Sequence, residues 1–266
     1  MTQLEIKQAL SARGYALDTP AGLKGAVEAF QTAAGLKVDG NAGPMTQAAL
    51  KAPIAAKPAP ALPAGGIAEL LTVARLRRFE PFARADILTG IAGSAAAIQA
   101  ASITTPLRLA HFLAQVSVES GGLAKLEEGL SYSAARLVEV WPNRFPTVAA
   151  ATPYARNSKA LAIKVYGGRL GNRAAPATDG WDFRGSGGLQ TTGRANFAEL
   201  GADANPDHLR TPEGFLAPAL HYWTSRGCNA LADRDDVVGI SVKINGGTNG
   251  LADRKTRLAA AKRVFA

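Results

Sequence analysis

Two carboxyl groups that could exchange protons with a substrate lie nine positions apart, at Glu119 and Glu128. Two carboxyl groups can serve as acid and base on a glycosidic bond, and a separation of about 6.5–9.5 Å leaves room for an attacking water. A helix continued over nine residues would hold them roughly 13 Å apart. The break at Gly121-Gly122 lets the chain turn and bring Glu128 back across a cleft. Glu127, directly beside Glu128, is the rival for the role of base.

Residues 106–119 are expected to form an amphipathic helix that ends at Glu119. Its apolar positions recur at helical spacing: Leu109, Phe112, Leu113 and Val116. Thr105-Pro106 favours a helix start, and Ser120-Gly121-Gly122 favours a stop. The helix dipole and desolvation both favour the protonated form of a carboxyl group at this end, as a general acid requires. The alternative to a catalytic role is that Glu119 is a solvated helix end and that Glu127 and Glu128 form a charged turn.

Three ordered stretches resemble glycoside hydrolase family 19, and most closely its phage-endolysin branch. They are residues 119–122 with 128–133, residues 183–197, and residues 244–254. Three matches in the family's order are more specific than any one alone. The sequence departs from the family pattern at Val118 in place of His, at Gly129 and Ser131 in place of Asn, and at Ser186 in place of the second Arg.

The resemblance implies that Glu119 is the general acid, that Glu128 is the general base, and that Thr192 helps to hold the attacking water. It also implies three residues that hydrogen-bond the sugar: Gln190, Asn196 and Asn245. From its position alone, Thr192 could instead cap a following helix.

For three further residues the sequence leaves two possible roles open. Tyr132 and Trp181 are either sugar-stacking residues or core residues. Arg254 either holds a carboxylate in the cleft or makes a structural ion pair.

Residues 1–52 are expected to form a small module of three helices, because turn signals such as Val38-Asp39-Gly40 separate short apolar runs. The module resembles the three-helix peptidoglycan-binding domain. Four residues are candidates for wall binding: Tyr15, Phe30, Gln31 and Asp39. The alternative is a stabilising or protein-docking module. Residues 53–66 are rich in Pro and Ala and are expected to be a semi-rigid linker.

Residues 67–266 are expected to form a larger, mainly α-helical, lysozyme-like domain. The expected helices cover residues 67–78, 86–101, 106–119, 133–140, 154–167, 193–200, 213–226, 235–244 and 252–264, and a short hairpin is conceivable over 181–190. The last helix is expected to turn Leu258 and Val264 inward and a basic face outward, a face that could contact anionic outer-membrane lipid.

Composition excludes several classes of protein. No apolar run approaches the roughly 20 residues that span a bilayer, and the first residues do not read as a secretory signal. The histidines His111, His208 and His221 lack metal-ligand spacing, so neither a metal nor another cofactor is expected. The one cysteine, Cys228, cannot form an internal disulfide. The net charge is +9, and residues 67–266 carry 24 basic and 17 acidic side chains; such a surface suits an anionic cell envelope.

Together with the two family resemblances, these observations predict a monomeric, modular endolysin that binds bacterial peptidoglycan and not nucleic acid. It would cut the β-1,4 bond between N-acetylmuramic acid and N-acetylglucosamine with inversion. It would reside in the host cytoplasm before release and then act on the wall. The runner-up functions are a chitinase and a non-catalytic protein that binds the wall or disrupts the envelope.

Overall fold

A computed structural model describes the chain except residues 12, 14, 16, 18–21 and 53–65. The described residues are mainly α-helical and contain no strand, as the sequence predicts. The conceivable hairpin over 181–190 is not formed, because the short helix α12 (Asp179–Asp182) occupies its beginning. Only two isolated antiparallel bridges occur there, from Ser186 to Glu127 and to Thr191. The predicted linker falls outside the described residues except for Gly66, which begins α4.

The first three helices share a core of their own. They are α1 (Gln3–Ser11), α2 (Gly22–Ala33) and α3 (Pro44–Lys51). Their buried apolar side chains are Ile6, Leu10, Ala26, Val27, Phe30 and Leu50. Pro44 occupies the first turn of α3, where its missing N–H leaves no hydrogen bond unmade. The predicted three-helix module is therefore present.

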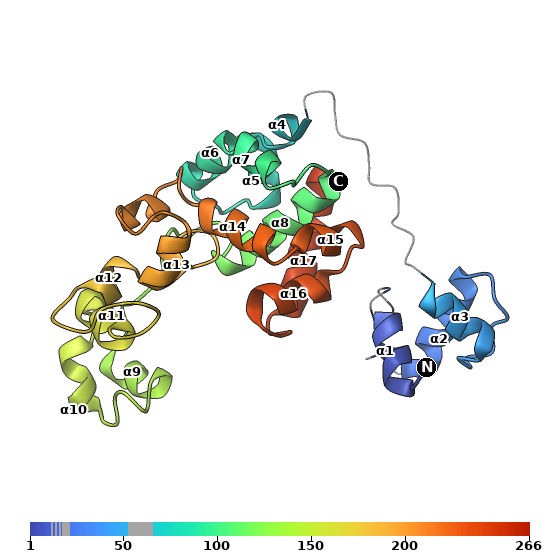
Figure 1. Cartoon of the computed structure of the whole chain (residues 1–266), viewed down its shortest axis with the longest axis horizontal. Coiled ribbons are helices and arrows are strands. Elements are labelled where there is room, and N and C mark those ends of the chain that lie inside the picture. Colours follow the sequence, from blue (N-terminus) through green and yellow to red (C-terminus); the bar gives the residue numbers. More distant parts are fainter. Residues whose placement is uncertain (12, 14, 16, 18–21, 53–65) are drawn as a thin grey trace.

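Residues 66–265 contain the remaining helices (Figure 1). The α-helices are α4 (Gly66–Leu70), α5 (Val73–Phe79), α6 (Ala85–Gly93), α7 (Ala95–Ala100), α8 (Pro106–Glu119), α9 (Ala134–Val140), α10 (Val148–Ala151), α11 (Ser158–Tyr166), α12, α13 (Arg194–Glu199), α14 (Ala217–Ser225), α15 (Cys228–Asp233), α16 (Val237–Asn245) and α17 (Leu251–Phe265). Two short 3-10 helices are η1 (Thr152–Tyr154) and η2 (Pro206–Arg210). None of the described helices combines the length and the apolar character that crossing a membrane requires.

Two expected helices are divided in the structure. The expected helix 67–78 becomes α4 and α5, because Thr72 accepts a hydrogen bond from the Arg75 N–H and starts a new helix. The expected helix 86–101 is divided at Ser94 into α6 and α7. The expected helix 106–119 is found with the same bounds.

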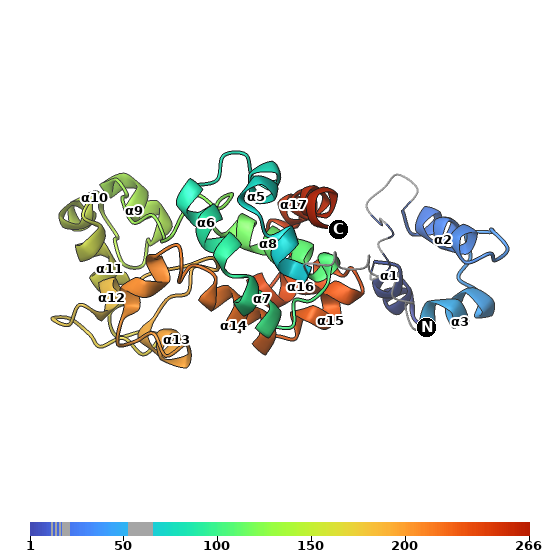
Figure 2. The same ribbon diagram turned by 90° about the horizontal axis from the view of Figure 1, so that it is seen from above.

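Helix α8 lies at the centre of the larger of two lobes. The side chains from Leu109 to Ser117 are all buried, as expected of a helix surrounded by protein. Helices α15 and α17 pack against it, and α6, α7 and α14 lie around it in both ribbon views (Figures 1 and 2). The core of this lobe includes Ile87, Phe112 and Trp223.

A second lobe is formed by α9–α12, at the left of Figure 1. It has a separate apolar core around Leu137, Phe145 and Leu161. A smaller cluster around Phe183, Phe197 and Leu209 lies under α13 and η2. Because each lobe has its own core, neither depends on apolar packing between the lobes, and a cleft can lie where they meet.

Gly90 of α6 should be intolerant of a side chain, because a Cβ added there would lie 2.1 Å from the carbonyl oxygen of Pro212. We expect Gly90→Ala to destabilise the protein by about 1–3 kcal/mol through overpacking. The matched control is Gly93→Ala in the same helix, where an added Cβ meets nothing within 4 Å; it should be neutral or stabilising by up to about 1 kcal/mol. Urea unfolding followed by tryptophan fluorescence reports on this part of the chain, since all three Trp lie in it. Equal midpoints for the two variants would contradict the packing argument.

Candidate active site

Glu119 is placed at the end of α8 by local signals at both ends of the helix. Thr105 caps the start by accepting a hydrogen bond from the Arg108 N–H at 3.2 Å, and Pro106 follows it in the first turn. At the other end the chain leaves the helix through Gly121 and Gly122, both with positive φ. The Gly122 N–H donates to the Ser117 carbonyl at 2.7 Å, a bond typical of a glycine-terminated helix. The predicted stop after Glu119 is confirmed.

The Glu119 carboxylate forms an ion pair with Arg254 of α17. The Arg254 side chain is 3% exposed and also donates to Gln115 Oε1, one helical turn before Glu119. The Glu119 side chain is about one quarter exposed, so it is supported from below and open above. The pair joins a buried arginine to a carboxylate that lines the cleft, so it fits both interpretations left open for Arg254. Its positive charge attracts the ionised carboxylate, an interaction that the dipole argument from the sequence left out.

A second buried charge supports the turn after Glu119. Glu80 follows α5 and is 4% exposed. It accepts a hydrogen bond from the Ser117 hydroxyl at 2.5 Å and forms an ion pair with Arg257. A Cβ at Gly122 would lie 3.5 Å from the Glu80 carboxylate. The sequence analysis missed Glu80 and Arg257. The position of Arg257, nearly one helical turn after Arg254 on α17, could have indicated Arg257, but no signal in the sequence indicated Glu80.

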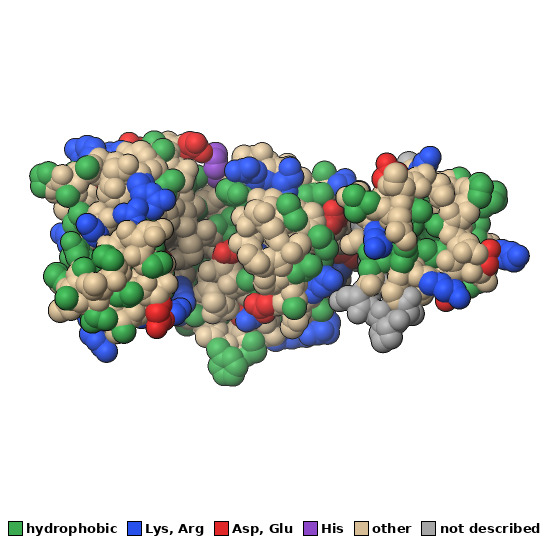
Figure 3. All heavy atoms as spheres, turned by 90° about the horizontal axis from the view of Figure 1, so that it is seen from below, with side chains coloured by type: hydrophobic (Ala, Val, Ile, Leu, Met, Phe, Trp, Pro, Cys, Tyr) green, Lys and Arg blue, Asp and Glu red, His purple; other side chains and the backbone are tan. Residues whose placement is uncertain are grey.

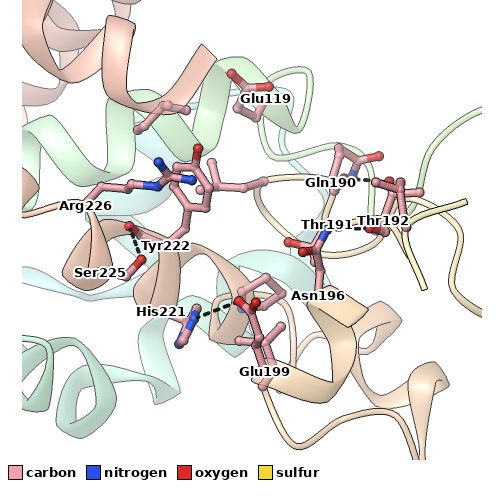
Figure 4. A pocket seen from close by; sticks show the side chains of 15 residues that line it. Glu119, Gln190, Thr191, Thr192, Asn196, Glu199, His221, Tyr222, Ser225 and Arg226 are labelled. Atoms are coloured by element: carbon pink, nitrogen blue, oxygen red, sulfur yellow. Dashed lines mark hydrogen bonds and ion pairs between the residues drawn. The ribbon is translucent and has the colours of Figure 1, made fainter. Parts of the chain in front are cut away.

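Glu119 faces a cleft with a volume of about 450 Å³. The cleft also contains three residues that the sequence analysis placed at the site: Gln190, Thr192 and Asn196. Figure 4 shows Glu119 on one side of the opening and these three on another, so four of the predicted residues come together. In Figure 3 the surface is hollowed between the lobe of α9–α12 and the central lobe.

The segment before α13 is shaped by hydrogen bonds to its own backbone. Gln190 has a φ of 52°, which non-glycine residues seldom adopt, and its side-chain amide donates to the Gly187 carbonyl at 2.9 Å. The Thr192 hydroxyl donates to the Gln190 carbonyl at 3.1 Å. Thr192 does not cap α13, because the residue at that position is Gly193. The Asn196 amide donates to the Thr192 carbonyl at 2.7 Å.

A buried carboxylate, Asp179, holds α13 in place. It accepts hydrogen bonds from the Arg194 Nε at 2.9 Å and from the Arg173 N–H at 2.8 Å. The bonds from Arg194 and Arg173 hold the pKa of Asp179 well below its usual range. Asn172 adds a bridge, because it accepts from the Arg194 N–H and donates to the Tyr166 carbonyl of α11. These contacts fix the cleft wall that carries Asn196.

Glu128 lines a second cavity, of about 460 Å³. One of its oxygens accepts from the Tyr166 hydroxyl at 2.7 Å and the other from the Gly185 N–H at 2.6 Å. Burial and the Glu128 charge raise the pKa of Tyr166 far above its usual range, so the hydroxyl stays protonated and remains a donor. Glu128 is only partly buried. A carboxylate held in this way keeps lone pairs for a water or a sugar hydroxyl.

Glu127 lines the same cavity as Glu128 but has different partners. It forms an ion pair with Arg184, and the Arg210 Nε lies 3.8 Å from its carboxylate. Arg210 also donates to the Ser186 hydroxyl at 2.8 Å. Ser186 stands where the family pattern has a second arginine, and Arg210 supplies a guanidinium there from η2.

Glu119 and Glu128 therefore line separate cavities that share one wall, and do not line one common cleft as the sequence analysis expects. Residues 184–192 border both, with Arg184 at the Glu128 cavity and Gln190 and Thr192 at the Glu119 cleft. The Gly187 N–H donates to the Leu126 carbonyl at 2.8 Å, which ties this wall to the turn before Glu127. Such an arrangement can place a proton donor and a base on two sides of one extended ligand.

Three predicted substrate contacts lie outside the two cavities. Tyr132 packs edge-on against Trp141 with ring centroids 5.3 Å apart, and Trp181 lies against the core of the same lobe. The guanidinium of Arg184 is 3.8 Å from the centroid of a Trp181 ring. Asn245 is exposed at the end of α16 and donates to the Asn249 carbonyl. Tyr132 and Trp181 are both partly buried and pack against the core of this lobe, which supports the core interpretation, while sugar stacking stays a prediction.

The first module also has a hollow, of about 460 Å³, at the turn before α3. Gln31 and Asp39 line it, and buried Gln31 organises the turn by donating to the Asp39 carboxylate at 2.8 Å and accepting from the Gly40 N–H at 2.9 Å. Phe30 is buried, and Tyr15 packs edge-on against it at 5.7 Å. The structure thus places Phe30 in the core of the module, away from the hollow.

Three of the five basic side chains of the last helix are paired with carboxylates, while Lys255 and Arg263 are exposed. Arg254 pairs with Glu119, Arg257 with Glu80, and Lys262 with Asp235 at 2.5 Å. Leu258 is buried and Val264 packs against the core, as expected. The sequence could not show these ion pairs, because each partner is distant along the chain.

Two further kinds of reactive group could form a site in the described residues: a cluster of metal ligands and the free cysteine. Among the described residues, no three His, Cys, Asp or Glu side chains gather as a metal ion would require. Burial raises the pKa of Cys228 to about 11, which keeps its thiol protonated.

The cleft residues that the sequence analysis missed include a group of four neighbours: His221, Tyr222, Ser225 and Arg226. All four belong to α14 or its C-terminal end. The signal that could have found them is a run of polar residues at helical spacing beside the buried Trp223.

Two comparisons with known proteins bear on the chain. A family model described as "Putative peptidoglycan binding domain" matches residues 4–50. The chain is also similar to a Haemophilus influenzae protein named "Glycosyl hydrolase family 19 domain-containing protein". The two are 35% identical over 164 residues, which cover 60% of this chain and 80% of that protein.

We expect the stability conferred by Asp179 to depend on pH. Because the pKa of Asp179 is lowered in the folded protein, its contribution is complete above the unfolded pKa of about 3.9 and is lost as the pH falls further. Asp179→Asn should cost about 2–3 kcal/mol at pH 7, and its deficit against wild type should shrink at pH 3. Urea unfolding at both pH values measures this, with exposed Glu213→Gln as the control. A deficit that is the same at pH 3 and pH 7 would contradict the role given to the Asp179 charge.

Proposed function

This chain belongs to glycosyl hydrolase family 19, and from that premise we propose that it cuts the β-1,4 bond between N-acetylmuramic acid and N-acetylglucosamine in peptidoglycan. It is a cell-wall glycoside hydrolase that carries a peptidoglycan-binding domain at residues 4–50. The observation that carries the proposal is the open face of Glu119 in a cleft shared with Gln190, Thr192 and Asn196.

In the proposed reaction Glu119 gives its proton to the glycosidic oxygen as the bond to the anomeric carbon breaks. Glu128 takes a proton from a water that attacks the anomeric carbon from the other face, which inverts its configuration. The Thr192 hydroxyl can accept from and donate to such a water. Each carboxyl group returns to its starting state when the protons exchange with solvent.

Arg254 has a defined part in this scheme. Before the reaction it orients the Glu119 side chain from below, together with Gln115. After Glu119 has lost its proton, the guanidinium stabilises the carboxylate that forms. A preorganised charge of this kind needs no rearrangement during the reaction.

Glu128 is assigned as the base, and Glu127 as a structural residue, because of their different partners. Glu128 accepts two hydrogen bonds from neutral donors, the Tyr166 hydroxyl and the Gly185 N–H. The Glu127 carboxylate is instead engaged by the Arg184 guanidinium. The oxygen of Glu127 that Arg184 engages is therefore not free to bind the attacking water.

The first module would hold the enzyme on its insoluble substrate. Linking a wall-binding module to a hydrolase raises the local concentration of cleavable bonds without new contacts in the cleft. We further propose that cleavage leads to lysis of the bacterial cell, as in a phage endolysin. The earlier stage in a host cytoplasm stays a prediction.

Chitin is the alternative substrate, because the resemblance that assigns the carboxylates covers chitinases as well. Mass spectrometry of digested sacculi and of chitin separates the two. New reducing ends on glycan with intact peptides support the proposal. Cut peptide or amide bonds with intact glycan would reject it, and cleavage of chitin alone would favour the alternative.

The carboxyl roles predict different outcomes for three variants. Glu119→Gln and Glu128→Gln should each lower the rate of reducing-end release from sacculi by at least about 100-fold, the scale of general acid–base catalysis. Glu127→Gln should lower it less than about tenfold and mainly reduce stability, because it weakens the pair with Arg184. All three should still sediment with sacculi, since the first module is unchanged.

The outcomes that would contradict this assignment are distinct. If Glu119→Gln released reducing ends at the wild-type rate, Glu119 would not be the acid. Loss of activity in Glu127→Gln but not in Glu128→Gln would exchange their roles. Lysis by a variant lacking both Glu119 and Glu128 carboxylates would favour a non-catalytic protein that disrupts the envelope.

A further inference from the structure

Helix α14 presents one polar face to the cleft. His221, Tyr222, Ser225 and Arg226 are spaced at i, i+1, i+4 and i+5, and all four line the cleft with Glu119. Residues at this spacing share one side of a helix. Figure 4 shows them along the wall beside Glu119, on a different side from Gln190 and Thr192.

Arg226 differs from Arg184 and Arg210, which line the other cavity, because it has no described acidic partner. Arg184 and Arg210 are bound to acidic side chains. Arg226 is exposed, and within the described part of the chain no carboxylate is paired with it. Its cleft therefore holds a positive charge that no described side chain neutralises.

The Arg226 side chain is nevertheless held in place. Its guanidinium carbon lies 4.8 Å from the centroid of the Tyr222 ring, a favourable contact between a cation and an aromatic face. Tyr222 is itself fixed, because its hydroxyl donates to the Lys243 carbonyl at 3.1 Å. A guanidinium supported on a ring loses little freedom when it binds a planar anion.

Two acidic side chains line this cleft, Glu199 and Glu119, and neither is paired with Arg226. Glu199 of α13 lies 3.8 Å from the His221 Nε2, and Figure 4 shows this pair together, away from the Arg226 guanidinium. Glu119, the other carboxylate of the cleft, is paired with Arg254. Glu199 and Glu119 thus each lie against a side chain other than Arg226, and no described ion pair occupies the Arg226 guanidinium. Arg226 is therefore available to a ligand.

We propose that Arg226 binds a carboxylate of peptidoglycan and so makes the cleft prefer peptidoglycan over chitin. This inference rests on the proposed function, since it concerns the substrate of the same site. Peptidoglycan carries carboxylates on its stem peptides, and on the lactyl group of muramic acid where the peptide has been removed. Chitin carries none. A guanidinium binds a carboxylate with two parallel hydrogen bonds, which neutral amide and hydroxyl groups cannot match.

The test compares four soluble substrates of similar length. They are uncrosslinked glycan strands with stem peptides, the same strands with their carboxylates converted to amides, strands stripped of peptides so that lactyl carboxylates are free, and N-acetylglucosamine oligomers. The proteins are the full-length wild type, Arg226→Gln, Arg226→Lys and the control Arg78→Gln. Arg78 is exposed on α5 and does not line the cleft. Reducing-end release gives kcat and KM.

On strands with peptides, Arg226→Gln should raise KM about fivefold to tenfold with little change in kcat, because a charge-assisted contact is lost. Arg226→Lys should lie between Arg226→Gln and wild type, and Arg78→Gln should match wild type. Amidation of the strands should raise the KM of wild type to that of Arg226→Gln. If the difference between wild type and Arg226→Gln persists on peptide-free strands, the lactyl carboxylate is the group bound; if it disappears, a stem-peptide carboxylate is.

Two results overturn the inference and leave the proposed function intact. One is an equal KM for wild type and Arg226→Gln on strands with peptides. The other is an equal rise in KM on native strands, amidated strands and N-acetylglucosamine oligomers, which would show a general effect on the cleft. Failure of wild type to release reducing ends from any substrate would instead reject the proposed function. Circular dichroism of each variant separates misfolding from a change in binding.

Discussion

The ion pair between Arg254 and Glu119 links the last helix of the chain to the functional end of the central helix. Arg254 is almost fully buried and also holds Gln115, so α17 must pack along α8 before the carboxylate can take its place. Removing one partner of such a pair leaves a charge uncompensated and is strongly unfavourable. Glu80 and Arg257 repeat the same device beneath the turn that follows Glu119. The geometry of the site therefore depends on contacts between distant parts of the chain.

The remaining walls of the cleft are held mainly by hydrogen bonds within a polar network. Asp179 and Asn172 fix α13 by hydrogen bonds to Arg173 and Arg194, and residues 184–192 are shaped mainly by bonds to backbone groups. One side is thus anchored in an apolar core, and the other is held by a polar network at the edge of a second core. A cleft between two such lobes can present groups from both sides to an extended polymer, while each group keeps a fixed orientation.

The combination of domains suits a solid polymer. The hollow of the first module is organised by Gln31, whose amide binds the turn that carries Asp39. The hydrolase has a separate cleft, with its own charges and its own core. The hollow of the first module and the cleft of the hydrolase are thus built from separate parts of the chain and rest on separate cores. Within that cleft Arg226 is not paired with a described carboxylate, whereas Arg254 is paired with Glu119.

The amino-acid sequence by itself determined where α8 begins and ends, the three helices of the first module, and the mainly α-helical fold. These features depend on contacts within about four residues, such as the cap at Thr105 and the stop at Ser120-Gly121-Gly122. Only the tertiary structure decided which cation meets Glu119, since Arg254 lies 135 positions away. It also separated Glu127 from Glu128, adjacent residues of like chemistry, through Arg184 and Tyr166, and it placed Arg226 in the cleft. The spacing of residues along the chain predicts contacts within one helix. The partner of a charged side chain depends instead on how the helices pack against each other.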